Sequence, residues 1–133
     1  MSTNMTQFLN ANHITMTSVW AQDNPQMANP IPGASHWRCT FRLGRKRMTT
    51  PFSMGSAHRG EPDAASVLDC LASDATGFEN AQSFEDWAGE YGYDTDSRTA
   101  ERTFKAVERQ ARKLRAFLGD DLYETLLWNT ERE

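Results

Sequence analysis

Residues 36–52 read HWRCTFRLGRKRMTTPF, and this stretch decides how the sheet of the fold is built. Apolar and polar side chains alternate along its first half, as in a half-buried strand: Trp37, Cys39, Phe41 and Leu43 alternate with Arg38, Thr40 and Arg42. Gly44-Arg45 is typical of a two-residue hairpin turn with glycine first. This turn predicts a register in which Leu43 faces Lys46, Phe41 faces Met48, Cys39 faces Thr50 and Trp37 faces Phe52. Because proline cannot donate to a sheet, Pro51 predicts that the second strand is an edge strand.

Upstream of the hairpin, residues 1–12 predict a partly ordered N-terminal segment. Within it, residues 6–12 predict a short helical turn with Thr6 as its cap, followed by a strand over residues 13–20. Three prolines and a glycine among small polar residues predict a loop over residues 21–35.

Downstream of the hairpin, the apolar period becomes helical. The first helix begins near Glu61, with Pro62 at its first position, Asp63 in its first turn, and a buried side formed by Val67, Leu68, Leu71 and Ala75. A variant of the capping box at Ser83-Phe-Glu-Asp86 opens a short helix that ends at Gly92.

The longest predicted helix begins after a cap between Asp94 and Ser97 and runs to about Leu118, with Gly119 as its stop. Its apolar residues recur every three or four positions: Ala100, Phe104, Val107, Ala111, Leu114 and Leu118. Asp120 or Asp121 then caps a final helix that carries Leu122, Leu126 and Leu127.

These elements predict an α+β fold, in which a small antiparallel sheet of about three strands is followed by about four helices packed on one face. The length of 133 residues predicts a single domain over residues 1–133. The sequence has neither a run of ~20 apolar residues nor the features of a signal peptide, so we expect a cytoplasmic protein without membrane contact. Cys39 and Cys70 are expected to be buried thiols in a reducing compartment.

The charges of the chain are segregated along the sequence. Residues 38–59 carry six basic and no acidic residues, residues 60–97 carry ten acidic residues and no lysine or arginine, and residues 98–115 carry seven basic and two acidic residues. The net charge of −4 therefore conceals blocks of opposite sign.

The acidic block predicts a surface that binds a basic partner. Six of its carboxylates are not explained by helix capping and are the predicted contact residues: Asp69, Asp74, Glu79, Glu85, Asp86 and Glu90. The alternative is that these groups pair with the basic residues of the same chain.

A ridge of basic residues follows the longest predicted helix at the same spacing as its apolar stripe: Arg98, Arg102, Lys105, Arg109 and Arg112. The ridge precedes the apolar residues by two positions, which turns it about 200° away from the core. Because most of its residues are arginines, which bind phosphates and carboxylates in bidentate geometry, the ridge is a candidate binding surface for either group. The alternative is an ordinary solvated helix face with Glu101–Lys105 and Glu108–Arg112 pairs.

The sequence contains no motif for a catalytic nucleophile, a phosphate-binding loop or a cofactor, so we predict no catalytic residue and no cofactor. The only local pair of metal-ligating type is His36-x-x-Cys39, whose side chains point to opposite faces of a strand. We therefore predict no metal site.

Several segments resemble small uncharacterised accessory proteins of tailed phages and prophages. These segments are Phe52–Gly55, Val67–Ala75, Ser83–Trp87, Gly92–Arg98 and Leu114–Gly119. The resemblance implies a phage accessory gene acting in the cytoplasm of a bacterial host, and it transfers no activity. By type alone, small acidic phage proteins include anti-defence proteins such as the anti-CRISPR proteins.

Three functional hypotheses follow. The first is a phage-encoded, non-enzymatic binding protein that inhibits or modulates a host nucleic-acid-handling defence machine through charged surfaces. The second is a small nucleic-acid-binding module that uses the basic hairpin and the basic ridge. The third and weakest is an enzyme that acts through clustered carboxylates.

Overall fold

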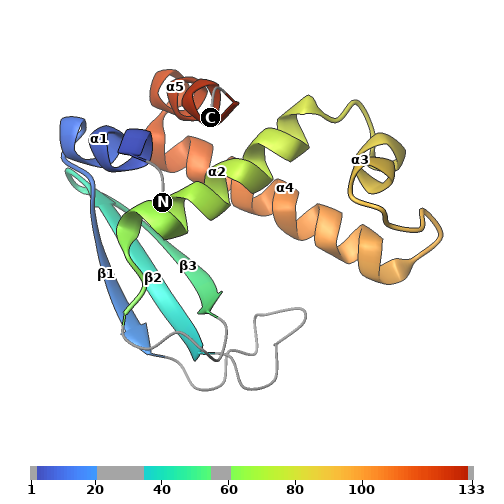
Figure 1. The fold of residues 1–133 in the computed structure, drawn as a ribbon, viewed down its shortest axis with the longest axis horizontal. Coiled ribbons are helices and arrows are strands. Elements are labelled where there is room, and N and C mark those ends of the chain that lie inside the picture. The colour runs from blue at the N-terminus through green and yellow to red at the C-terminus, as the bar shows by residue number, and fades with distance from the viewer. Residues whose placement is uncertain (1–2, 21–34, 55–60, 132–133) are drawn as a thin grey trace. The chain divides into compact units, whose positions relative to one another are not determined.

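The computed structural model describes residues 3–20, 35–54 and 61–131, and over these ranges the chain has an α+β fold. The described residues form three strands and five helices, which Figure 1 labels. In chain order they are α1 (Thr3–Ala11), β1 (Thr15–Trp20), β2 (Ser35–Leu43), β3 (Lys46–Met54), α2 (Ala64–Asn80), α3 (Phe84–Glu90), α4 (Arg98–Leu118) and α5 (Asp120–Glu131). The predicted fold class is confirmed. The predicted loop over residues 21–35 lies outside the described residues except for Ser35, which begins β2.

The chain divides into two compact units, Met1–Leu68 and Asp69–Glu133, with the boundary inside α2. We call them the N-terminal and the C-terminal unit. A single domain over all 133 residues, with the helices on one face of the sheet, stays a prediction.

Helix α1 begins three residues before the predicted turn, so Thr6 lies inside the helix and is not its cap. The apolar spacing explains the earlier start, because Met5, Phe8 and Leu9 are buried on successive turns. After the helix, His13 takes a left-handed conformation with φ of 56°, and the Ile14 N–H donates to the Leu9 carbonyl. This reversal ends the helix and leads into β1 at Thr15, two residues later than predicted.

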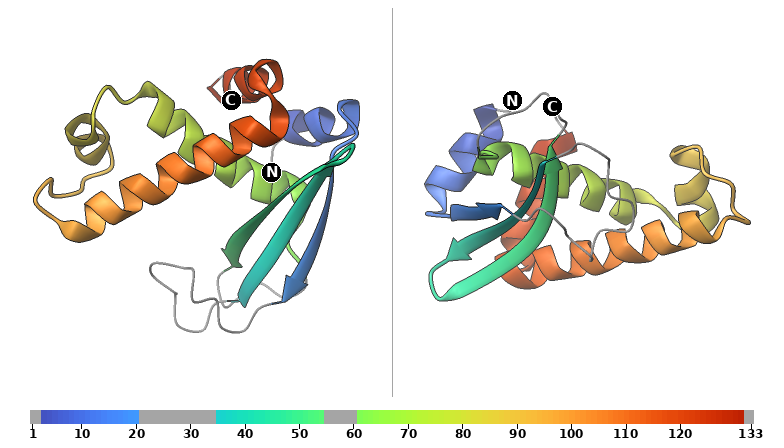
Figure 2. Two further views of the ribbon diagram at one scale, coloured as in Figure 1. Left: turned by 180° about the vertical axis from the view of Figure 1, so that it is seen from behind. Right: turned by 90° about the horizontal axis from the view of Figure 1, so that it is seen from below.

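The hairpin of β2 and β3 has the predicted register in each of the four expected pairs, from Leu43 opposite Lys46 to Trp37 opposite Phe52. Gly44 has φ of 59°, as a glycine-first turn requires. Strand β1 pairs antiparallel with β2, so the order is β1-β2-β3 and β3, which carries Pro51, is an edge strand as predicted. Figure 2 shows the three strands as one twisted sheet.

Helix α2 begins at Ala64, so neither Pro62 nor Asp63 lies inside it. Asp63 instead caps the helix, because its carboxylate accepts the Ser66 N–H at 2.8 Å and the Ser66 hydroxyl at 2.9 Å. The predicted buried side is confirmed at Val67, Leu68, Leu71 and Ala75.

In the C-terminal unit, α3 begins after Ser83, whose hydroxyl accepts the Asp86 N–H at 3.1 Å as the predicted cap requires. Trp87 is 3% exposed and is the centre of an aromatic cluster. The rings of Phe84, Tyr91, Tyr93 and Phe104 lie 5.2–6.5 Å from it, centroid to centroid. This cluster joins α3 to α4.

Helix α4 has the predicted bounds, with Ser97 as its cap and Gly119, at φ of 85°, as its stop. Of the predicted apolar stripe, Ala100, Ala111, Leu114 and Leu118 are buried, while Phe104 and Val107 are partly buried. Figure 2 shows α3 beside the N-terminal end of this helix.

Helix α5 follows α4 without a separate acidic cap, because the Tyr123 N–H donates to the Gly119 carbonyl at 3.0 Å and Asp120 and Asp121 lie in the first turn. The prediction that either aspartate caps this helix is wrong. Leu126 and Tyr123 are the buried residues of this helix within the described range.

Candidate functional site

The six predicted contact carboxylates do not form one surface. Asp69, Asp74 and Glu79 are five residues apart on α2, and five residues turn a helix by about 500°, so each points about 140° away from the one before. On α3, Asp86 and Glu90 lie one turn apart on the same side, and Glu85 points elsewhere. The spacing alone could have shown this.

A groove of about 400 Å³ lies in the C-terminal unit, where α2, α3 and Thr130 of α5 meet. Two of the predicted carboxylates, Asp86 and Glu90, line it together with Trp87 and Tyr91. The Tyr91 ring lies over Gly77 of α2, where any larger side chain would meet its hydroxyl end. The absence of a side chain at Gly77 therefore lets the tyrosine form one wall of the groove.

A third carboxylate, that of Asp74, acts on the same tyrosine. Partial burial raises the pKa of Tyr91, and the negative charges of Asp74 and Glu90 raise it further. Asp74 is exposed, but the protein around its carboxylate displaces enough water that desolvation raises the pKa of this group as well. We call the groove with Asp74, Asp86, Glu90 and Tyr91 the acidic groove.

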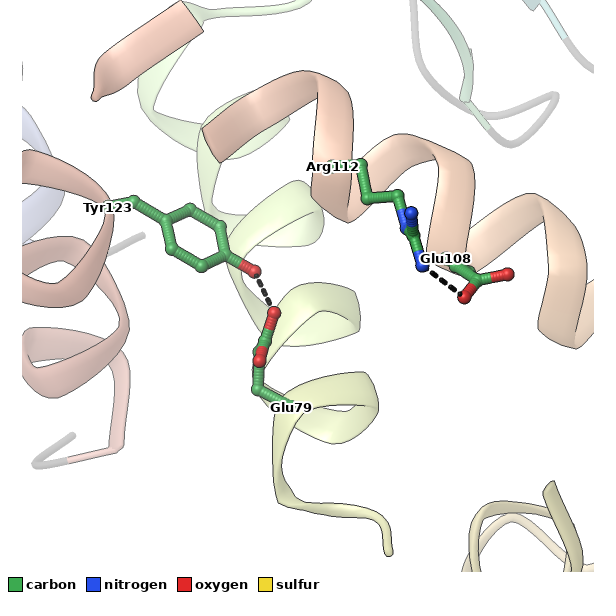
Figure 3. Close-up of polar contacts among 4 residues, drawn as sticks. All are labelled: Glu79, Glu108, Arg112 and Tyr123. Atoms are coloured by element: carbon green, nitrogen blue, oxygen red, sulfur yellow. Dashed lines mark hydrogen bonds and ion pairs between the residues drawn. The ribbon is translucent and has the colours of Figure 1, made fainter. Parts of the chain in front are cut away.

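Two of the six carboxylates have partners within the chain. Glu79 accepts a hydrogen bond from the Tyr123 hydroxyl at 2.9 Å, which joins α2 to α5 (Figure 3). The Asp86 carboxylate accepts the Gln82 N–H at 3.1 Å and so stabilises the start of α3. Asp86 was expected to have no role in helix capping, and this expectation is wrong. No described residue forms an ion pair or side-chain hydrogen bond with Asp69, Asp74, Glu85 or Glu90.

Tyr123 was not predicted to belong to any site. Burial raises its pKa, the hydrogen bond to Glu79 and the charge of that carboxylate raise it further, and Arg115 lowers it. The Arg115 guanidinium lies 5.6 Å from the centre of the Tyr123 ring, and its Nε donates to Asp120 at 2.8 Å. Tyr123 and Glu79 are 44 residues apart, so no local pattern could have shown their contact.

Two exposed aromatic side chains, Tyr91 of the acidic groove and Tyr93, contact Trp87, which also lines the groove. Tyr91 is 49% exposed and Tyr93 is 40% exposed, and both rings contact Trp87 at 5.3 Å between centroids. They are held in place by a buried ring and yet reach solvent. No sequence pattern had pointed to Tyr91 or Tyr93 as surface residues, because their position depends on their contact with Trp87.

All five residues of the basic ridge are exposed, as their spacing predicts. Two of them have carboxylate partners one turn earlier, since Lys105 Nζ lies 3.2 Å from Glu101 and Arg112 donates to Glu108 at 3.0 Å (Figure 3). Within the described ranges, Arg98, Arg102 and Arg109 have no ion pair or side-chain hydrogen bond, and no pair joins the ridge to the acidic block.

The histidines and cysteines in the described ranges do not come together. No group of three or more His, Cys, Asp or Glu residues there could hold a metal ion. His36 bonds to Ser53 through Nδ1 at 2.8 Å, and burial raises the pKa of Cys39 to about 11. The prediction that Cys70 is buried is wrong, because α2 turns this thiol toward solvent.

None of the helices in the described part of the chain has both the length and the apolar character of a membrane span. No protein-family model, no curated protein and no solved structure matches this chain.

Proposed function

We propose that the chain is a phage-encoded, non-enzymatic binding protein that inhibits or modulates a nucleic-acid-handling defence machine of the bacterial host. In this proposal the acidic groove contacts a basic surface of that machine. The phage origin rests on the resemblance of the sequence segments, and the host target rests only on the type of small acidic phage protein. The contact surface rests on the side chains of the C-terminal unit.

The observation that supports the contact surface is that Glu90 and Tyr91 line one groove and that the negative charges of Asp74 and Glu90 both act on this tyrosine and raise its pKa. Neither carboxylate has a cationic partner among the described residues, so both are available to a lysine or arginine of another protein. Protein interfaces combine such charges with a few aromatic side chains that contribute most of the binding energy. Tyr91 and Tyr93 supply those aromatic groups here.

The proposed class of partner follows from this charge. A protein that handles nucleic acid carries a basic groove that binds phosphates. An acidic protein surface is negatively charged, as the phosphates are, and can therefore occupy the same groove. Such contacts act mainly on the association rate and weaken as salt screens the charges.

The test compares two double variants that remove the same charge. Asp74→Asn with Glu90→Gln neutralises the two groove carboxylates that have no described partner and leaves Asp86, which stabilises the start of α3. Asp69→Asn with Glu85→Gln neutralises two carboxylates outside the groove. All four substitutions keep the side-chain shape, so both variants should fold. The proteins are used as bait in a host lysate, and the rate of association with each captured protein is then measured.

Each of the two carboxylates is expected to form an exposed ion pair with the partner that contributes about 0.3–1 kcal/mol to binding. Losing both pairs should reduce the affinity of the groove variant about 3- to 30-fold. The other variant should bind like the wild type. Equal losses in both variants would contradict a contact at the acidic groove. Capture that does not change with salt would contradict an electrostatic contact altogether.

A further inference from the structure

The arginines of the basic ridge divide into paired and unpaired residues, and the unpaired ones share a narrow stripe. At about 100° per residue, Arg98, Arg102 and Arg109 fall within about 40° around the axis of α4. Glu101 and Glu108 lie on one flank of this stripe, where they hold Lys105 and Arg112. We call Arg98, Arg102 and Arg109 the arginine stripe.

We propose that the arginine stripe binds the phosphate backbone of a nucleic acid duplex. At a rise of about 1.5 Å per residue, the stripe extends about 16 Å along a straight helix. A duplex carries one negative charge per about 1.7 Å of its axis, so the stripe lies beside about ten phosphate charges. The guanidinium groups, which have no described partner, can each take a phosphate in bidentate geometry.

A duplex fits the stripe better than an acidic protein does. Protein interfaces depend on buried aromatic or aliphatic side chains, and the exposed large apolar residues in the described ranges are Val19, Trp20, Tyr91, Tyr93 and Trp128. None of these lies on α4. Charge without an apolar anchor is typical of binding to the phosphate backbone.

The same observation favours a duplex over a single strand. Proteins that bind single strands stack the bases on aromatic side chains, and α4 exposes none. The net charge of −4 gives the chain as a whole no attraction for nucleic acid, so binding should depend on the stripe and be weak and sensitive to salt. The stripe shares no residue with the acidic groove, so either surface can fail its test alone.

The experiment measures the fluorescence anisotropy of a labelled duplex DNA of about 20 base pairs over a series of salt concentrations. Each phosphate that an arginine neutralises contributes about −0.9 to the slope of log affinity against log salt concentration. Three arginines therefore predict a slope near −2.7 for the wild type. Arg102→Ala with Arg109→Ala should reduce the steepness by about 1.8. The control Arg45→Ala with Arg47→Ala removes the same charge from the exposed hairpin and should leave the slope unchanged.

Three results would overturn the proposal. The first is no binding of the duplex even at low salt, and the second is an equal change of slope in the hairpin control. The third is tighter binding of a polyglutamate peptide than of the duplex, which would assign the stripe to an acidic protein. Binding of the duplex with a salt slope that becomes less steep by about 1.8 in the stripe variant, and stays unchanged in the hairpin control, supports the proposal.

Discussion

Replacing Tyr123 with phenylalanine removes one hydroxyl group from the C-terminal unit and keeps the ring. The hydroxyl donates to the Glu79 carboxylate at 2.9 Å, and the ring itself is 2% exposed. Hydrogen bonds to charged groups contribute about 1.5–3 kcal/mol to stability, less where the partner can be hydrated. Glu79 is exposed and keeps water as an alternative partner, so we expect a loss of about 1–2 kcal/mol at pH 7.

The difference between the two proteins should depend on pH in a defined direction. The pKa of Tyr123 is raised in the folded protein, so above the ordinary tyrosine value of about 10 the unfolded chain releases this proton first. The stabilising contribution is therefore complete below pH 10 and decreases as the pH rises toward the folded pKa, by about 1.4 kcal/mol per pH unit at most. Near pH 11 the wild type and Tyr123→Phe should have similar stabilities.

The assay is urea unfolding followed by circular dichroism at pH 7, 9, 10 and 11. Tyr93→Phe is the control, because it also removes a phenolic hydroxyl but leaves the Tyr123–Glu79 bond in place. Its stability should fall above pH 10 as that of the wild type does. If wild type and Tyr123→Phe are equally stable at pH 7 and lose stability in parallel above pH 10, the bond between α2 and α5 does not contribute.

Two further predictions concern burial. Leu114→Asp places a carboxylate at a position that is 1% exposed and should lower the free energy of unfolding by more than about 4 kcal/mol. Arg109→Ala, on the opposite face of α4, should change it by less than about 0.5 kcal/mol. Thermal melting of the two variants measures both effects. Iodoacetamide should modify the exposed Cys70 in the folded protein and leave the buried Cys39 intact, which mass spectrometry can read; modification of both at equal rates would contradict the assigned burial.

The sequence named the three carboxylates of the acidic groove, but it did not predict that they lie near Tyr91. The acidic block included the three carboxylates assigned to the acidic groove, Asp74, Asp86 and Glu90. It also included Glu79, which accepts a hydrogen bond from Tyr123 of α5, and Asp69 and Glu85, which do not line the groove. Composition shows how many carboxylates a segment carries, whereas a groove depends on which of them face one another. Tyr91 entered the site because Gly77, fourteen residues earlier, leaves room for its ring.

The sequence by itself determined the hairpin register, the bounds of α4 and the exposure of the basic ridge. These features depend on neighbours within a few residues: alternation sets the faces of a strand, a glycine sets the turn, and a serine and a glycine set the ends of a helix. Only the tertiary structure decided that Glu79 binds Tyr123 and that the charge of Asp74 acts on Tyr91. Those contacts join different helices, and their geometry comes from the packing of the helices rather than from any local preference of the chain.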